Sequence, residues 1–151
     1  MNKRGFSAIE LLTVIVIVGI ITAFGIPRIR SAVLRSNVRS AKAAMGTLVA
    51  KARAVAVARG CNATMTLSST DQTVSISVCN VNGTGTEILG GVDSLAARFN
   101  VAMRPSTSTL TFDPRGLSTN YATLVVGFSS ISSSSVSDSV IVNPLGQVVR
   151  Q

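Results

Sequence analysis

Residues 6–26 read FSAIELLTVIVIVGIITAFGI, an almost uninterrupted run of apolar residues. As an α-helix rising about 1.5 Å per residue, it is long enough to cross the roughly 30 Å hydrocarbon core of a bilayer. Its only charged residue is Glu10. An acidic side chain inside lipid costs on the order of 2.5–3.5 kcal/mol. We therefore predict a membrane-spanning helix whose one acid either has a functional partner or lies in the headgroup layer.

Residues 3–17, KRGFSAIELLTVIVI, resemble the leader and helix start of type IV pilins and type II secretion pseudopilins. The resemblance implies that a prepilin peptidase removes residues 1–5 by cleaving between Gly5 and Phe6, and that the new amine of Phe6 is methylated. It also implies a role for Glu10 in assembly, because its carboxylate would neutralise the N-terminal ammonium of a neighbouring subunit. We expect loss of Glu10 to impair assembly more than membrane insertion.

Two other interpretations of the N-terminus stay open. A secretory signal has the same basic start and apolar centre, and Ala23-Phe24-Gly25 resembles its small-residue cleavage site. Glu10 at the front of the apolar stretch counts against this interpretation, as does a helical pattern that continues past Gly25. An uncleaved single-pass anchor is the second alternative, and it leaves the spacing from Gly5 to Glu10 without a reason.

The composition argues against an enzyme. The chain has 151 residues, which leaves room for one soluble domain of roughly a hundred residues beside the membrane segment. It contains no histidine, so His-based catalysis and the commonest metal ligand are excluded. The acids after Glu10 are Asp71, Glu87, Asp93, Asp113 and Asp138. They are too scattered in the sequence to predict a calcium site. We expect no catalytic residues, no metal and no cofactor.

Positive charge is concentrated in residues 28–59. The formal net charge is +8, yet no acid lies between Leu11 and Thr70. At about 100° per residue, residues 28–60 form an amphipathic helix that continues the first one, with a kink permitted at Pro27 and a stop at Gly60. Its basic side would hold Arg28, Arg35, Arg39, Lys42 and Arg53, and its apolar side Val33, Leu34, Ala41, Ala44, Leu48, Ala52 and Val55.

The basic side has several possible uses. It could be a solvated face that keeps the helix soluble, or it could contact lipid phosphates, acidic faces of neighbouring subunits, or DNA. The charges just after the membrane segment favour a cytoplasmic C-terminal side by the positive-inside rule. Long domains translocate largely regardless of charge, however, and both the leader resemblance and the cysteines favour the periplasm. We therefore expect a periplasmic domain.

Cys61 and Cys79 predict a periplasmic disulfide, with two unpaired buried thiols as the alternative. A hairpin of residues 61–68 and 72–79 that turns at residues 69–71 would place Cys61 opposite Cys79. That register puts the apolar residues of the two strands on opposite faces of the hairpin. A bulge or a different pairing is needed to satisfy both signals.

After Gly60 the sequence has short runs of branched and aromatic residues between turn signals, which predict short strands, and no second helix is obvious. Strands are predicted at residues 64–67, 73–78, 98–103, 109–112, 122–128, 139–142 and 147–149. The sequences Asp113-Pro114-Arg115-Gly116 and Asn143-Pro144-Leu145-Gly146 have Asx, proline and glycine where a type I turn prefers them. Residues 82–85 and the serine-rich residues 129–139 read as exposed loops.

Residues 51–60, 112–116 and 140–150 resemble the GspH/FimT group of minor pseudopilins and minor pilins, so that the resemblance covers nearly the whole chain. It implies an α+β, pilin-like fold in which one long N-terminal helix packs on a small antiparallel β domain. The expected organisation is a leader at residues 1–5, a transmembrane and filament-core helix at 6–27, an amphipathic helix at 28–60, and a periplasmic β domain at 61–151.

The same resemblance implies a structural function in the bacterial inner membrane and in a filament. The expected partners are other pilin or pseudopilin subunits and the prepilin peptidase, and the expected place is the tip of a type II secretion pseudopilus. The alternative is a type IV pilus minor pilin that acts in pilus priming or DNA uptake. Some FimT-type minor pilins bind DNA through arginines near the C-terminus, and the candidates here are Arg115 and Arg150. This chain keeps only one arginine in its C-terminal motif, so we expect little DNA binding.

Overall fold

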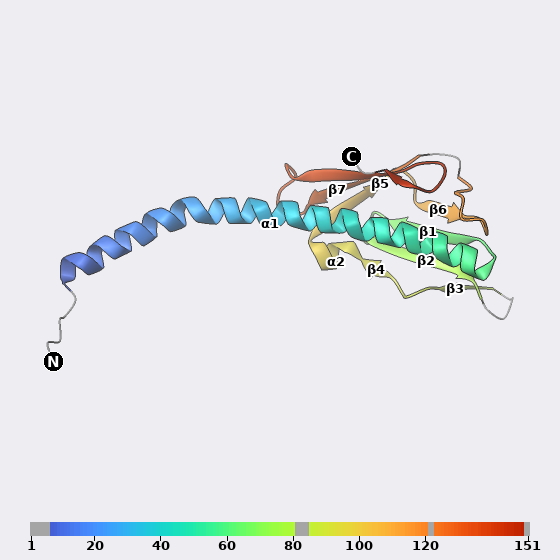
Figure 1. Cartoon of the computed structure of the whole chain (residues 1–151), viewed down its shortest axis with the longest axis horizontal. Helices are drawn as coiled ribbons and strands as arrows, with labels where there is room; N and C mark the ends of the chain where they lie inside the picture. Colours follow the sequence, from blue (N-terminus) through green and yellow to red (C-terminus); the bar gives the residue numbers. More distant parts are fainter. Residues whose placement is uncertain (1–6, 81–84, 121–122, 150–151) are drawn as a thin grey trace. The chain divides into compact units, whose positions relative to one another are not determined.

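The computed structural model describes residues 7–80, 85–120 and 123–149. Helix α1 runs from Ala8 to Arg59 (Figure 1), so the single long helix predicted from the sequence is confirmed. Pro27 lies inside this helix. The chain divides into two compact units between Val33 and Leu34. Glu10 is the one acid in the first turn of α1.

Gly60 ends α1, as predicted. The glycine has a positive φ of 64°, which residues with a side chain rarely adopt. Its N–H donates to the carbonyl of Val57, and the N–H of Cys61 donates to the carbonyl of Ala56. These two bonds are the pair that defines a Schellman motif, so the last carbonyls of the helix are satisfied where the chain turns toward the first strand.

Two antiparallel sheets follow the helix. The first sheet has the order β3-β2-β1-β6, with β4 also paired to β2, and the second has the order β5-β7-β8-β9. The first sheet is built from β1 (Ala63–Ser68), β2 (Thr73–Cys79), β3 (Thr86–Ile88), β4 (Asp93–Ser94) and β6 (Thr109–Phe112). The second is built from β5 (Val101–Pro105), β7 (Leu124–Ser130), β8 (Ser137–Val142) and β9 (Val148–Val149). The predicted α+β fold is confirmed.

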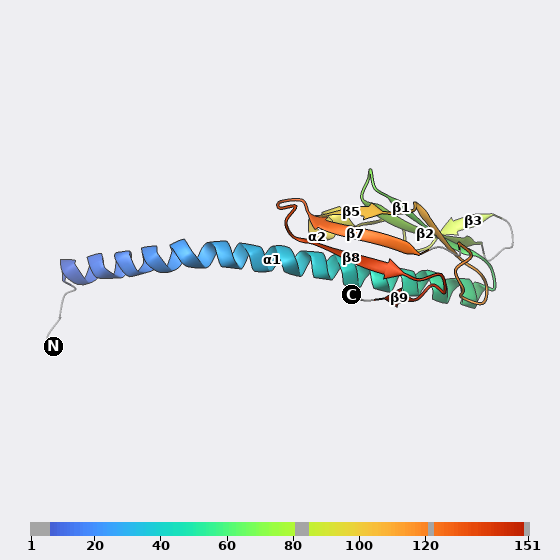
Figure 2. The same cartoon turned by 90° about the horizontal axis from the view of Figure 1, so that it is seen from above.

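The second part of α1, residues 34–59, packs on the inner faces of both sheets. Figure 2 shows β8 running alongside this part of the helix. The helix contributes six buried residues to the core, namely Val38, Ala41, Met45, Val49, Ala52 and Ala56. Only Ala41 and Ala52 of these were on the predicted apolar side. The buried line is displaced around the helix by roughly 70° from the predicted one at about 100° per residue. Lys42 and Arg53 consequently lie close to the buried face and are half-buried.

The hairpin of β1 and β2 has the different pairing that was one of the two alternatives left open by the sequence. Ala63 pairs with Val78, and Leu67 pairs with Val74, which is a shift of one residue from the pairing that places the two cysteines opposite each other. The shift puts the apolar residues of both strands on the buried face, because side chains alternate with a period of two. Cys61 precedes β1 and still bonds to Cys79, with their Cα atoms 6.3 Å apart. The disulfide prediction is confirmed without a bulge.

Three short elements were missed by the sequence reasoning. Residues predicted to begin a strand at Arg98 instead form helix α2 (Leu95–Phe99), and β3 and β4 were not predicted. Ser94 caps α2 by accepting a hydrogen bond from the N–H of Ala97 at 3.3 Å. The helix is only five residues long, so its hydrophobic period is too short to be recognised in the sequence.

The serine-rich segment is shorter as a loop than predicted. Ser129 and Ser130 belong to β7, while Ser137 begins β8, so only residues 131–136 connect the two strands. The paired backbone of β7 and β8 satisfies its hydrogen bonds regardless of side-chain type. The predicted loop of residues 129–139 is therefore wrong at both ends. Of the predicted loop 82–85, only Gly85 lies within the described residues.

Gln72 links the two sheets. It lies in the turn between β1 and β2 with a positive φ of 57°. Its side-chain amide accepts from the N–H of Met103 and donates to the carbonyl of the same residue in β5. A glutamine side chain thereby occupies the place of a neighbouring strand at the edge of the second sheet, which leaves that edge less open to another chain.

Candidate assembly surfaces

The apolar first part of α1, residues 8–33, is exposed at every residue except the half-buried Gly25. Ile9, Ile15 and Phe24 are 66%, 63% and 73% exposed. The helix contains an 18-residue window with a mean hydropathy of 2.6 in which no residue is buried, so it is long and apolar enough to cross a membrane. An exposed apolar surface of this size is typical of a membrane segment or of an interface between proteins.

Glu10 bonds to the start of its own helix in the isolated chain. The N–H of Ser7 donates to Oε2 of Glu10 at 3.0 Å. Ser7 directly precedes α1 and Glu10 lies three residues further on, which is the spacing of a capping box. The sequence motif Ser-x-x-Glu could have revealed this contact, and the sequence reasoning missed it. The predicted cleavage site at Gly5 and Phe6 lies outside the described residues.

Two threonines in the apolar stretch satisfy their hydroxyl groups within the helix. Oγ1 of Thr13 donates to the carbonyls of Ile9 and Glu10, and Oγ1 of Thr22 donates to the carbonyls of Val18 and Gly19. A hydroxyl group without a partner is costly in an apolar environment. These bonds allow the polar residues of the stretch to enter lipid or an apolar bundle of helices.

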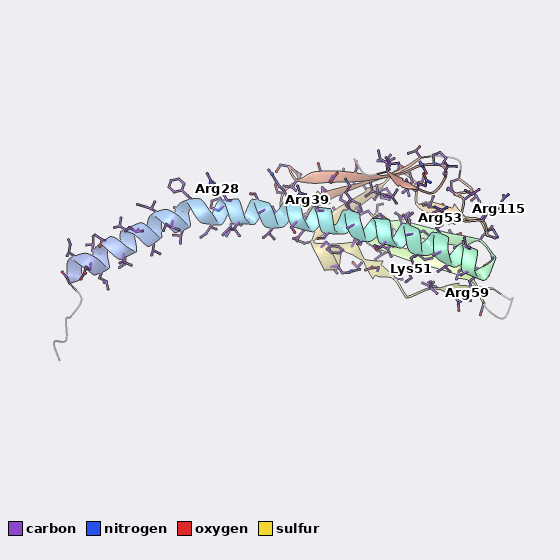
Figure 3. The ribbon with its side chains drawn as sticks, in the orientation of Figure 1. Arg28, Arg39, Lys51, Arg53, Arg59 and Arg115 are labelled. Carbon is purple, nitrogen blue, oxygen red and sulfur yellow. A yellow bond between two sulfur atoms is a disulfide. The ribbon has the colours of Figure 1, made fainter. Side chains whose placement is uncertain are left out.

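Several basic residues of α1 contact strands and a turn of the domain. Nζ of Lys42 lies 2.9 Å from Oδ1 of Asp138 in β8, and the Arg59 guanidinium lies 2.8 Å from Oε1 of Glu87 in β3. Arg53 also packs over the turn at Gly116, where an added Cβ would meet its Nε at 3.0 Å. Figure 3 shows Arg53 beside this turn and Arg59 at the end of the helix. Part of the predicted basic side therefore holds strands and turns of the same chain.

Asp138 has a pKa below the ordinary aspartate value. Partial burial alone would raise this pKa, but the hydrogen bonds from Lys42 and from the N–H of Ser139 outweigh burial, and the positive charges of Lys42 and Arg39 lower it further. The ionised carboxylate is consequently favoured in the folded domain. Asp138 thus connects the backbone of β8 to α1 through its negative charge.

The two predicted turns are confirmed, and each carries an Asx side chain that holds the loop. Asp113 accepts bonds from the N–H groups of Arg115 and Leu117, and Asn143 accepts bonds from those of Leu145 and Gln147. The bond from the Leu117 N–H is the main reason why the pKa of Asp113 lies below its ordinary value, and Arg115 adds to this effect although burial opposes it. The glycines of both turns have positive φ angles.

The described structure places one of the two candidate DNA-binding residues, Arg115. The Arg115 side chain is 82% exposed, and its Nε lies 3.0 Å from Oδ2 of Asp113 in the same turn. The neighbouring carboxylate reduces the positive potential that Arg115 offers to a phosphate. Arg150 lies outside the described residues.

A groove of about 1150 Å³ follows the second part of α1 on the side of β8 and β9. Its lining is mostly apolar, includes several small residues of the helix, and also contains charged residues. The lining residues are Arg39, Lys42, Ala43, Gly46, Thr47, Val49, Ala50, Arg53, Ala54, Val57 and Ala58 of α1, together with Asp138, Val140, Gly146, Gln147 and Val148. This groove was not predicted, because it depends on where the helix crosses the second sheet.

The long helix on two antiparallel sheets is the fold of a pilin-like subunit. The type IV minor pilin FimU of Pseudomonas aeruginosa strain PAO1 has a similar structure in two crystal forms, with TM-scores of 0.61 and 0.59 and 14% sequence identity in each. The matches cover 78% and 75% of this chain and 90% and 91% of the FimU chain. At this identity, the similarity concerns the fold.

The family follows from the sequence of the same region. Residues 43–146 match the family described as "Type II transport protein GspH", and the matched region covers more than half of the chain. This chain belongs to the GspH family and is a minor pseudopilin or minor pilin. No curated protein has a matching sequence. The resemblance to the GspH/FimT group is thereby confirmed, whereas the leader peptide remains a prediction.

Proposed function

We propose that this protein is a minor pseudopilin at the tip of a type II secretion pseudopilus and that it contributes to protein secretion. The observation that carries this proposal is the contrast within α1. Its first part exposes a continuous apolar surface with a single acid, while residues from Val38 onward bury their apolar side chains in the core of the domain. A subunit of this construction can place its first helical part in a bilayer or a helical bundle and still keep a folded domain outside.

Glu10 is the proposed assembly residue. In the isolated chain its partner is the N–H of Ser7, which is a neutral group. The amine of a neighbouring subunit, created by cleavage between Gly5 and Phe6, would give the carboxylate a partner of opposite charge. A charged pair is favoured over a single charge in an apolar bundle, because each ion then compensates the other.

The proposed location is the inner membrane with the domain in the periplasm. The disulfide between Cys61 and Cys79 supports this orientation, since disulfides persist in the oxidising bacterial periplasm and are rare in the cytosol. An alkaline phosphatase fused after Gln151 is expected to be active. Mass spectrometry of the mature chain is expected to show an N-methylated Phe6 as the first residue. An inactive fusion, or a chain still starting at Met1 in the assembled filament, would contradict the proposal.

The alternative is a minor pilin that primes a type IV pilus or acts in DNA uptake. The fold of FimU, a type IV minor pilin, favours this reading, whereas the name of the matched family favours secretion. The two functions separate in a deletion strain. Loss of secreted proteins from the medium with normal surface pili supports the secretion function. Loss of pili with normal secretion supports the alternative.

A further inference from the structure

The groove between α1 and the strands β8 and β9 is larger than a site for a small molecule. Pockets for such ligands measure roughly 300–1,000 Å³, and this groove measures about 1150 Å³. Its helix residues extend from Arg39 to Ala58. This span corresponds to about 29 Å at 1.5 Å per residue, or to about eight or nine residues of an extended chain. The dimensions fit a peptide segment.

The charge of the groove calls for an acidic occupant. Arg39 and Arg53 line it, and among the described residues neither has a carboxylate within 4.0 Å. All six acids of the chain lie in the described part, and they are Glu10, Asp71, Glu87, Asp93, Asp113 and Asp138. Asp138 is the only acid that lines the groove, where it bonds to Lys42. Among the described residues, the side chains therefore supply no further acid within 4.0 Å of Arg39 or Arg53.

The edge of β8 favours an extended occupant. Strand β9 pairs only with Ile141 and Val142, so residues 137–140 have no neighbouring strand on that side among the described residues. The Ser139 N–H at this edge donates to Oδ1 of its neighbour Asp138 at 2.7 Å, so the carbonyl of an added strand would have to displace this side-chain acceptor. A backbone edge that opens onto a groove is the feature that added strands recognise.

We propose that this groove binds an extended acidic segment of another pilin-type subunit. The segment lies along the edge of β8, and two of its carboxylates pair with Arg39 and Arg53. These arginines are fourteen residues apart in α1, which is about 21 Å. Two side chains six residues apart on one face of an extended strand are about 20 Å apart, so they reach both arginines. The statement that the segment comes from another pilin-type subunit rests on the proposed function, whereas its extended shape and its acidic character rest on the groove itself.

The test uses the full chain in detergent with the photoreactive residue p-benzoylphenylalanine in place of Ala50, an exposed residue of the groove. The chain is mixed with each of the other pilin-type subunits of the same cell, purified in the same detergent. We expect an adduct with one of them, mapped by mass spectrometry to an extended segment that contains acids. The same label at Thr66, an exposed residue of β1 away from the groove, is expected to give none.

Charge reversal tests the role of the arginines. The double variant Arg39→Glu/Arg53→Glu is expected to weaken binding of that subunit about tenfold or more. The two new carboxylates would repel the carboxylates of the bound segment. The matched control Arg35→Glu/Arg104→Glu changes the net charge equally at exposed residues that do not line the groove. It should bind as the unchanged chain does. If the reversed variant unfolds, as judged by circular dichroism, Arg39→Gln/Arg53→Gln replaces it, with an expected weakening of smaller size.

Several results would overturn the proposal. These are an adduct with a second copy of this chain or with detergent, an adduct mapped to a partner helix, and equal weakening by both double variants. If subunits associate through their N-terminal helices and the Ala50 label captures none, the groove proposal alone fails. If no pilin-type subunit associates with the chain in any form, the proposed function fails as well.

Discussion

The two parts of helix α1 are both rich in apolar residues, but they differ in what covers them. Leu11 and Ile17 in the first part are 59% and 55% exposed, whereas Met45 and Val49 in the second part are 0% and 1% exposed. The second part is covered by the two sheets of its own chain. The first part has no such cover from the described residues of its own compact unit. Burial in the chain stabilises the domain, and the remaining apolar surface is available for lipid and for other subunits.

The largest expected effect comes from Glu10→Ala. The variant should insert into the membrane and fold its domain, because Glu10 makes no described contact outside the start of its helix. It should lose most of its incorporation into the filament, since the amine of the neighbour would have no carboxylate partner. Co-sedimentation with sheared filaments measures this loss, and Glu10→Gln is the isosteric control without charge. Normal incorporation of both variants would contradict the assigned role.

A matched pair of truncations sharpens the comparison of the two helix parts. Met45→Ala should lower the free energy of unfolding of the domain by about 2–5 kcal/mol, because it removes a fully buried side chain. Ile15→Ala should leave that stability unchanged, since Ile15 is exposed. Guanidinium unfolding of the full chain in detergent, followed by circular dichroism, measures both. Equal destabilisation would mean that the first part of the helix also packs in the domain.

The disulfide is expected to stabilise the domain that covers the second part of α1, and not the exposed first part. Cys61 directly follows the end of α1, and its bond to Cys79 closes a loop with a sequence separation of 18. Closing a loop of this size stabilises a domain by about 3 kcal/mol in the chain-entropy model. The double variant Cys61→Ser/Cys79→Ser should show this loss in the same unfolding experiment. The unchanged chain under a reducing agent should match it, and unaltered stability of both would contradict a structural role.

The pair of Lys42 and Asp138 has a smaller effect that depends on pH. Because the folded pKa of Asp138 is lowered, its contribution is present above the unfolded value of 3.8 and is lost as pH falls through the folded pKa. At neutral pH, Asp138→Asn should cost at most about 1 kcal/mol, since the carboxylate is partly exposed and screened by solvent. The difference between variant and unchanged chain should shrink as the pH falls below 3.8 and through the lowered folded pKa of Asp138. A difference that grows at low pH would contradict this sign.

The smallest expected effect is on DNA. Arg115 is paired with Asp113, so Arg115→Ala should leave the weak binding of duplex DNA at physiological salt unchanged in a gel-shift assay. Full-length chain in detergent is the sample, and a salt series is the control. Tight binding that weakens steeply with salt would indicate phosphate contacts and favour the DNA-uptake alternative.

Most of the fold was predictable because its signals are local. The apolar run from Leu11, the stop at Gly60 and the Asx-Pro-x-Gly turns each act over a few residues, and the structure places all three as predicted. The short elements α2, β3 and β4 have two to five residues, which is too few for a periodic pattern. The cysteine pair was predictable from the sequence, whereas the contact of Glu10 with Ser7 and the ion pair of Lys42 with Asp138 appeared only in the structure.

One long helix with an apolar start, a set of short strands and two cysteines can be read from the residues alone, because local periodicity and composition set these features. The pairing register of β1 and β2, the burial of Val38 and Met45, and the groove beside β8 depend on how the helix and the sheets pack together. The physical reason is that register and helix rotation are fixed by contacts between residues far apart in the chain. Such contacts form where both segments bury apolar area, and the local sequence pattern of one segment does not show which other segment it will contact.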